Sequence, residues 1–169
     1  MIEIGIIGAR NSGKTTLIEK MASLLSHRGL RVATVKHTFH SHTFDTEGKD
    51  TFRHRRAGAR FTVGISSADM ALFASPDEEN RVKIFEFLKN NCDVCFVEGN
   101  KGAKRSTILL TRKIDDLGEI SSDHIIAVYG PVNNNMANDY FPLDKTEELA
   151  EFVIGRFGLQ PEDDDHERD

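Results

Sequence analysis

The 169-residue sequence predicts a three-layer α/β fold, in which helices cover both faces of a parallel β-sheet. Two observations favour this fold class. Short apolar runs alternate along the chain with segments of helical periodicity, and such alternation builds parallel sheets from strand–helix–strand units. A glycine-rich segment also joins the first predicted strand to the first predicted helix. We expect a single domain over residues 1–160 and a disordered acidic tail over residues 161–169.

The first half of the chain begins with an apolar strand at residues 2–7. A helix follows to about residue 28, because apolar residues recur on one face and Gly29 stops it. A second strand is predicted at residues 31–36, a polar loop at 37–48 and a helix at 49–57. Residues 61–66 and 70–74 read as two short strands that could form a β-hairpin extension of the fold.

The second half begins with a helix start at Ser75, with Pro76 in the first position and Glu78 completing a capping box. The apolar run at residues 94–97 is typical of a central parallel strand. Further strands are predicted at residues 106–112 and 125–129. The last helix opens at Asp144 and closes near Gly158.

The segment between the first strand and helix has the pattern G-x-x-x-x-G-K-[ST], from Gly8 through Gly13 and Lys14 to Thr15. In this strand–loop–helix context the pattern predicts a phosphate-binding loop, and hence a P-loop NTPase fold. Backbone N–H groups would surround the β-phosphate, and Lys14 would reach the β- and γ-phosphates. The Thr15 hydroxyl would bind Mg²⁺. The sequence therefore predicts binding of a nucleoside di- or triphosphate.

A phosphate loop needs an acid at the end of a neighbouring strand, and Glu98 follows the apolar run at 94–97. Glutamate, where most such proteins have aspartate, favours a contact with Mg²⁺ through water or a role in orienting an attacking water. The sequence gives a weaker indication of which nucleotide base is bound. The nearest match to the guanine-reading Asn-Lys-x-Asp pattern is residues 112–115, with Arg112 in place of Asn. Motif spacing alone does not separate GTP from ATP.

Three histidines and an aspartate lie close together after the second strand: His37, His40, His42 and Asp45. We favour a metal-free ligand-binding or catalytic loop. A transition-metal site and a solvated loop with incidental histidines stay open, since the spacing fits no closed zinc pattern.

The next segment, residues 48–60, carries five cations and one acid. Lys49, Arg53 and Arg56 recur at helical spacing and would share one side of a helix. Such a side suits an anionic ligand, for example a phosphate-bearing cofactor. The alternative is a solvated helix face.

Charge and composition exclude several classes of function. The net charge of −5 equals that of the acidic tail, so the rest of the chain has no basic excess and nucleic acid is not an expected partner. We expect neither a membrane span nor a secretory signal, since Glu3 interrupts the first apolar run. Cys92 and Cys95 make no disulfide framework, and Cys95 reads as a buried hydrophobe. A cytoplasmic protein is expected.

The phosphate loop, Lys36-His37, the block at residues 48–59 and Val97-Glu98-Gly99 together resemble the molybdopterin-guanine dinucleotide biosynthesis protein B family. The likeness covers about residues 1–130, and the block at 48–59 is its specific part. It implies a GTP-binding P-loop protein, similar in fold to nitrogenase-iron-protein and signal-recognition-type NTPases. Members pair as homodimers, hydrolyse GTP weakly and assist the guanylyltransferase that attaches GMP to molybdopterin.

The resemblance also implies roles for individual residues. The phosphates would be held by Asn11, Ser12, Gly13, Lys14, Thr15 and Thr16. Thr15 and Glu98 would bind Mg²⁺, and Lys14 and Glu98 would be the catalytic residues. The nucleotide or molybdopterin side would be lined by His37, Asp45, Asp50, Arg53 and Arg56. Residues 100–102 depart from the family pattern, which leaves the role of the loop at 99–105 open.

Two other functions remain as alternatives. A nickel metallochaperone GTPase would use the histidine loop and the cysteine pair. A small-molecule ATP-dependent kinase would use the basic helix to bind its acceptor.

Overall fold

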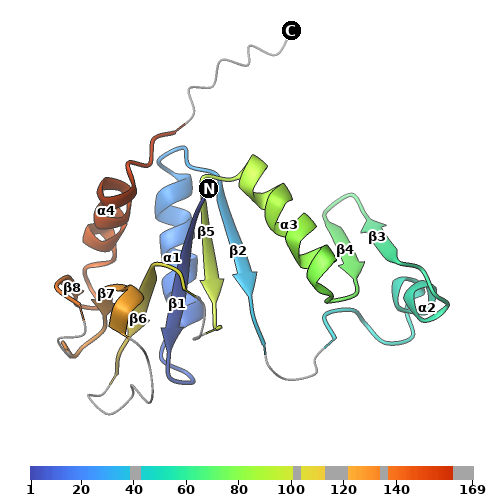
Figure 1. The fold of residues 1–169 in the computed structure, drawn as a ribbon, viewed down its shortest axis with the longest axis horizontal. Coiled ribbons are helices and arrows are strands. Elements are labelled where there is room, and N and C mark those ends of the chain that lie inside the picture. Colours follow the sequence, from blue (N-terminus) through green and yellow to red (C-terminus); the bar gives the residue numbers. More distant parts are fainter. Residues whose placement is uncertain (39–42, 101–103, 113–121, 134–136, 162–169) are drawn as a thin grey trace, which may run out of the picture. The chain divides into compact units, whose positions relative to one another are not determined.

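A computed structural model describes residues 1–38, 43–100, 104–112, 122–133 and 137–161 (Figure 1). It divides the chain into two compact units. The first unit comprises Met1–Thr38 and Leu88–Asp169, and the second comprises Phe39–Phe87. Each unit is described below by itself, and the expected single domain over residues 1–160 stays a prediction. The acidic tail from residue 162 onward lies outside the described residues.

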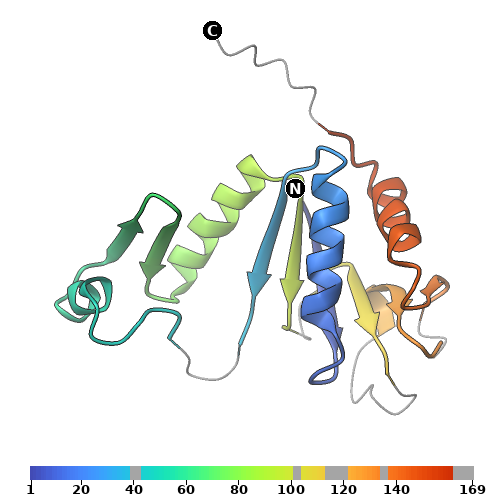
Figure 2. The same cartoon turned by 180° about the vertical axis from the view of Figure 1, so that it is seen from behind.

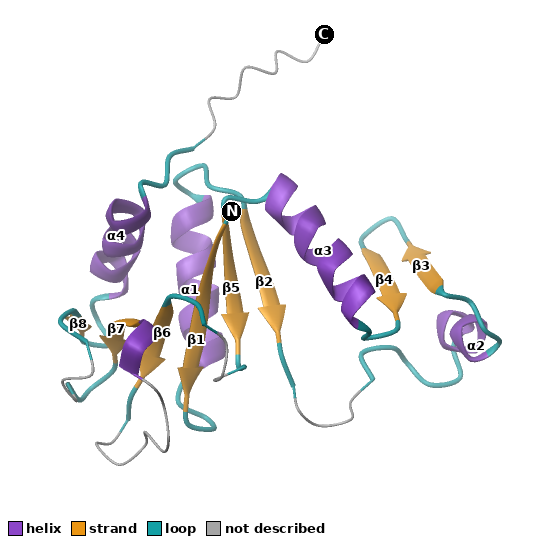
Figure 3. Ribbon diagram, viewed as in Figure 1, coloured by secondary structure: helices purple, strands orange, loops and turns teal. Residues whose placement is uncertain are grey.

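The first unit contains a six-stranded sheet whose described strand pairs are all parallel (Figure 3). Its spatial order is β2-β5-β1-β6-β7-β8. The strands are β1 (Ile2–Gly8), β2 (Val32–Lys36), β5 (Val94–Glu98), β6 (Thr107–Leu110), β7 (Ile125–Tyr129) and β8 (Tyr140–Phe141). The predicted parallel α/β fold is confirmed, and β8 is an additional short strand that the sequence pattern did not indicate.

Helices α1 (Lys14–Ser26) and α4 (Thr146–Phe157) pack on one face of this sheet. Figure 2 shows this face, with α1 in front of the strands. The buried face of α1 is the predicted one: Leu17, Ile18, Met21 and Leu25. These side chains join alternate residues of the central strands, among them Ile4, Ile6 and Phe96, in the main core.

The opposite face of the sheet carries a smaller core of Ala33, Cys95 and Val97. Leu88, near the end of α3 (Glu78–Asn91), packs against it. Residues 95 and 97 point away from residues 94 and 96 because successive side chains of a strand alternate between faces. Helical residues therefore contact both faces of the sheet, as the sequence predicts.

The strand register brings one end of each central strand to the same edge. Gly8 of β1 pairs with Leu110 of β6, and Lys36 of β2 pairs with Glu98 of β5. Parallel strands all present their carboxyl ends at one edge of the sheet, where ligands of open α/β folds bind. The amino end of α1 follows Gly8 directly after a short loop and so begins at this edge.

The second unit contains α2 (Asp50–Arg56) and an antiparallel hairpin of β3 (Phe61–Ile65) and β4 (Met70–Ala74). The predicted hairpin is confirmed. Its turn is closed by a hydrogen bond from the Ser66 amide to the Asp69 carbonyl, at 2.9 Å.

The predicted cap of α3 at Ser75 is wrong. Asp77 accepts a hydrogen bond from the Asn80 amide at 2.8 Å and so caps the helix two residues later. Ser75 contributes only its carbonyl, which accepts from the Asn80 side chain at 3.0 Å. The last helix also differs from the prediction, since α4 begins at Thr146 and its cap residue, Lys145, makes no side-chain capping bond. No helix within the described ranges has the length and apolar character that crossing a bilayer would need.

Candidate nucleotide-binding site

The loop between β1 and α1 is tightly curled. A Cβ atom at Gly8 would lie 2.7 Å from the backbone oxygen of Leu110 and 2.8 Å from the hydroxyl of Ser12, so only glycine fits there. Asn11 and Gly13 adopt left-handed backbone conformations, with φ angles of 59° and 97°. Left-handed residues within such a loop turn successive N–H groups toward a common centre, and this arrangement binds anions. The predicted phosphate loop therefore has a backbone shape that suits anion binding.

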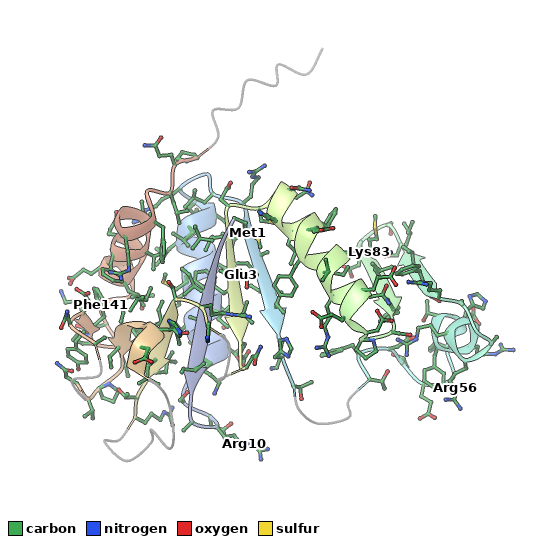
Figure 4. All side chains as sticks on the ribbon, viewed as in Figure 1. Met1, Glu3, Arg10, Arg56, Lys83 and Phe141 are labelled. Carbon is green, nitrogen blue, oxygen red and sulfur yellow. The ribbon has the colours of Figure 1, made fainter. Side chains whose placement is uncertain are left out.

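Lys14 folds back over this loop. Its ammonium donates to the carbonyl of Ala9 at 2.6 Å and lies 3.3 Å from the carbonyl of Gly8. A positive charge is thus held above the curled backbone. Arg10, at the tip of the loop, points away from the sheet (Figure 4).

Ser12 lies inside the loop, and the residue is 5% exposed. Its hydroxyl oxygen is buried, and the described residues offer it no hydrogen-bond partner. A buried polar group without a partner costs free energy, so native proteins seldom leave one unsatisfied. An oxygen of a bound phosphate would supply the missing partner, and the loop therefore fits this group chemically.

The acid of the site is Glu98, the last residue of β5, whose side chain is 16% exposed. Its Oε2 atom accepts from the Thr15 hydroxyl at 3.5 Å and lies 3.7 Å from the ammonium of Lys36. The backbone here is held firmly, because the His37 amide donates to the Glu98 carbonyl at 2.9 Å. A hydroxyl and a carboxylate are the oxygen ligands that Mg²⁺ prefers, so this pair fits the predicted metal.

Beside the loop lies a cavity of about 600 Å³ in the first unit. One wall comes from the phosphate loop and α1, and the other from the last residues of β6 and β7 and from residues after β6, β7 and β8. The lining residues are Ser12, Gly13, Thr16, Leu17, Lys20, Leu110, Arg112, Tyr129, Pro131 and Leu143. Of the predicted base-reading segment, Arg112 lines this cavity, and residues 113–115 lie outside the described residues. The cavity is large enough for a nucleoside and joins it to the phosphate loop.

Lys36, Tyr129 and Leu143 are site residues that the sequence patterns missed. A signal for Lys36 was present, since a cation ends one predicted strand and an acid ends another. Tyr129 and Leu143 carry no such signal. They reach the cavity only through the fold, in which the Tyr129 hydroxyl donates to the Leu143 carbonyl at 2.6 Å.

The remaining predicted site residues fall into both units. His37 follows β2 in the first unit, whereas Asp45, Asp50, Arg53 and Arg56 belong to the second. A cavity of about 730 Å³ on α2 brings Asp50, Arg53 and Arg56 together, with His54 and Phe52 beside them. Arg53 and Asp50 form an exposed ion pair at 3.8 Å. Arg56 points outward from the helix (Figure 4).

Asp45 has internal partners. Its side chain is 3% exposed, and its Oδ1 atom accepts from the Thr51 hydroxyl at 2.8 Å. Its Oδ2 atom lies 3.6 Å from Nε of Arg55, whose guanidinium stands over the ring of Phe73 at 5.4 Å. The interactions of Asp45 thus join the loop before α2 to the helix and, through Arg55, to β4.

The histidine loop and the cysteine pair give no metal centre within the ranges described. His40 and His42 lie outside those ranges, and the searched residues contain no group of three or more His, Cys, Asp and Glu. Both cysteines are free thiols. Burial raises the pKa of Cys95 from 9.0 to about 11, with a smaller contribution from Glu3, so this thiol stays protonated as a small core residue.

The parallel sheet, the curled loop with its lysine and the acid at the next strand end define a P-loop nucleotide-binding protein of the α/β class. The family described as Molybdopterin guanine dinucleotide synthesis protein B matches residues 3–130. The chain belongs to this family.

Several relatives and solved structures are similar to the chain over most of its length. The molybdopterin-guanine dinucleotide biosynthesis adapter protein of Escherichia coli K12 is 33% identical over 153 residues, which cover 85% of this chain and 86% of the relative. The probable adapter protein of the same name from Bacillus subtilis is 31% identical and covers 74% of this chain and 73% of its own. A crystal structure titled molybdopterin-guanine biosynthesis protein B is 28% identical, with a TM-score of 0.75 over 94% of this chain and all of its own. The crystal structure of Bacillus subtilis MobB is 26% identical, with a TM-score of 0.73 over 92% of this chain and 98% of its own.

Proposed function

We propose that the protein binds GTP with Mg²⁺ at the phosphate loop and serves as an adaptor in the synthesis of molybdopterin guanine dinucleotide. There it would assist a guanylyltransferase that attaches GMP to molybdopterin, and its own GTP hydrolysis would be slow. The carrying observation is Lys14 held over a curled loop, with the Thr15 hydroxyl 3.5 Å from Glu98. Family membership supports the pathway, since the similar E. coli and B. subtilis proteins are named adapter proteins of this synthesis.

The phosphates would be held by the loop and by the first turn of α1. Lys14 would leave the carbonyls of Gly8 and Ala9 for the β- and γ-phosphates, because its charge is better matched by phosphate oxygens. The amides of residues 11–16 would donate to the same phosphates, and the Ser12 hydroxyl would gain its partner. Thr15 and Glu98 would hold Mg²⁺, directly or through water, and the ion would neutralise phosphate charge.

The nucleoside would occupy the cavity of about 600 Å³ beside the loop. Leu143, which is 50% exposed, would offer apolar surface to a base, and Arg112 and Lys20 would offer cations near the ribose and phosphates. The preference for guanine rests on the family, because these residue types accept either purine.

The second unit would present the molybdopterin side. Arg53 and Arg56 offer fork-shaped donors beside a cavity of about 730 Å³, and such donors suit a phosphate-bearing cofactor. Asp50 would adjust the position of Arg53, with which it pairs. Asp45 would hold α2 to the loop before it. His37 follows β2 in the first unit and would belong to the nucleotide side there.

We also propose a homodimer that forms through the hairpin. The face of β3 and β4 opposite Thr62 and Phe73 is apolar and exposed. Its residues are Phe61, Val63, Ile65, Met70 and Leu72, which are 44% to 75% exposed. A contiguous apolar face of this kind marks an interaction surface. A cytoplasmic location remains part of the proposal, since both thiols are free.

The function is tested by calorimetry with GTP, GDP and ATP in the presence of Mg²⁺, on the wild-type protein and on Lys14→Ala. We expect GTP to bind in the micromolar range and Lys14→Ala to lose binding. A preference for ATP that appears only with an added acceptor would instead indicate a kinase, and nickel retained after chelation and dialysis would indicate a metallochaperone. Addition of the GTP-loaded protein to a molybdopterin guanylyltransferase should raise the yield of the dinucleotide, and an unchanged yield would contradict the adaptor role.

A further inference from the structure

Lys36 is a second cation near the residues of the predicted phosphate site, in addition to Lys14. It is the last residue of β2, and its ammonium lies 3.7 Å from Oε2 of Glu98. The same oxygen accepts from the Thr15 hydroxyl at 3.5 Å. One carboxylate oxygen thus stands between the predicted metal-binding hydroxyl and a second ammonium.

The backbone around this ion pair is fixed. Lys36 and Glu98 are register partners on adjacent parallel strands, and the His37 amide donates to the Glu98 carbonyl at 2.9 Å. Gly99, which follows Glu98, packs closely against His37, which follows β2. A Cβ atom at Gly99 would lie 2.9 Å from the His37 carbonyl oxygen. The position of Lys36 relative to the acid is therefore built into the sheet.

The two side chains differ in their freedom. The Glu98 side chain is 16% exposed, whereas that of Lys36 is 60% exposed. An exposed ion pair contributes little to folding stability, so stability gives a weak reason for a lysine at this position. The long, flexible lysine stem instead lets its ammonium move by several ångströms while the acid stays in place.

We propose that Lys36 contacts the terminal phosphate of the bound nucleotide and makes the site favour a triphosphate over a diphosphate. This inference rests on the proposed binding of a guanine nucleotide. Mg²⁺ in P-loop proteins bridges the β- and γ-phosphates, and Thr15 and Glu98 mark where the ion would be held. β5 stands between β1 and β2 in the sheet, so Lys36 approaches Glu98 from the side opposite the phosphate loop. If Glu98 helps to hold the ion between the β- and γ-phosphates, a cation on its far side would be nearer to the terminal phosphate than to the loop-bound β-phosphate.

The ion pair with Glu98 is then the resting position of Lys36. In this position the ammonium faces the Glu98 carboxylate of the nucleotide-free protein. If Glu98 holds Mg²⁺, its Oε2 atom would be shared with the ion, and the Lys36 ammonium would be free to pair with a phosphate oxygen. Triphosphate binding and release of Lys36 are therefore coupled.

The test is calorimetry of GTP and GDP binding in Mg²⁺ on wild type, Lys36→Met and Lys36→Arg. Loss of one charge-assisted contact lowers affinity by about tenfold, so Lys36→Met should bind GTP about tenfold more weakly and GDP within about twofold of wild type. Lys36→Arg keeps the charge and should retain most of the GTP preference. Lys89→Met, which removes an exposed lysine of α3, is the matched control and should change neither affinity. Lys36→Gln serves as a second neutral variant if the methionine variant folds poorly.

Equal losses of GTP and GDP affinity would show that Lys36 only supports the loop, and unchanged affinities would reduce the contact to a surface ion pair. Either result overturns the inference while the proposed function stands. A wild-type protein that binds no guanine nucleotide would overturn both.

Discussion

Gly8 is the residue at which sterics alone decide whether the phosphate loop can form. A methyl group there would meet the Leu110 backbone oxygen at 2.7 Å, and this neighbour belongs to the sheet and cannot move aside. We expect Gly8→Ala to shift the loop and to weaken GTP binding by about tenfold or more, with a loss of about 1–3 kcal/mol in unfolding free energy.

Gly155→Ala is the control, because a Cβ atom there meets no atom within 4 Å. This change in α4 should leave GTP affinity unaltered and raise stability by about 0.5–1 kcal/mol. Calorimetry and urea unfolding measure both effects, and a Gly8→Ala variant with wild-type affinity would contradict the role given to the loop.

Asp45 and Asp50 are neighbouring acids with opposite environments, so they separate a structural role from a surface one. Asp45 is buried against Thr51 and Arg55, whereas the Asp50 side chain is largely exposed beside Arg53. Removal of one partner from a buried pair strands the other, and we expect Asp45→Ala to lower the unfolding free energy by about 2–3 kcal/mol. Asp50→Ala should change it by less than about 0.5 kcal/mol. Thermal and urea unfolding give both values, and equal effects would refute the structural role of Asp45.

Cys95 gives the protein a defined response to alkaline pH. Its folded-state pKa is raised from 9.0 to about 11 by burial, so folding favours the protonated thiol. The stabilisation is fully present below pH 9 and is lost as the pH rises from 9 to 11, because the unfolded chain then releases a proton that the folded chain keeps. We expect a Cys95→Ala variant to lose less stability than wild type over this window, and urea unfolding at pH 8 and pH 10.5 measures the difference.

At pH 8 iodoacetamide should modify Cys92, which is partly exposed, far faster than Cys95. Rapid modification of Cys95 in the folded protein would contradict the assigned burial.

At the scale of elements, local patterns predicted most of the fold. The buried face of α1 and the hairpin each depend on residues adjacent in sequence, and the structure confirms them. The loop at residues 8–15 has the expected curled backbone, and its binding of phosphate stays a prediction. The cap of α3 was misjudged because Ser75 and Asp77 both suit capping, and the bond from the Asn80 amide to Asp77 decides between them. Lys36 and the cavity beside the loop depend on which strands become neighbours. No local pattern encodes that order, since β2 pairs with β5 and not with β1.

The hairpin is the element whose apolar face predicts the assembly. Ile65 and Met70 are register partners at its end and are 75% and 72% exposed. If this face joins two copies, lysines at both positions should repel their counterparts and expose polar groups to a buried interface, which costs several kcal/mol. We therefore expect Ile65→Lys with Met70→Lys to convert a dimer to a monomer by light scattering at about 50 μM, a concentration at which a stable dimer is fully formed. Val82→Lys, on the exposed side of α3, is the matched control and should leave the dimer intact. A wild-type monomer, or dissociation by Val82→Lys alone, would exclude the hairpin as the interface.

At the scale of the whole molecule, the proposed nucleotide site and the proposed molybdopterin side belong to different units of the chain. The phosphate loop, Glu98 and the cavity beside them all belong to the first unit, and the basic helix belongs to the second. If nucleotide binds as proposed, all of its contacts come from the first unit, so bound nucleotide should stabilise that unit directly. How far the effect extends to the second unit is a measurable property of their coupling.

The measurement is thermal unfolding followed by calorimetry, with and without GTP and Mg²⁺. A ligand at a hundred times its dissociation constant stabilises the folded state by about 2.7 kcal/mol, which raises the midpoint by about 5–10 °C for a chain of this size. If the units unfold together, we expect one transition that shifts as a whole. If they unfold separately, only the transition of the first unit should move, and Asp45→Ala should lower only the other. Lys14→Ala is the control, because it should remove the shift while keeping the unfolding profile of the nucleotide-free protein. A shift that persists in Lys14→Ala would mean that the nucleotide binds elsewhere, since no phosphate loop holds a triphosphate well without its lysine.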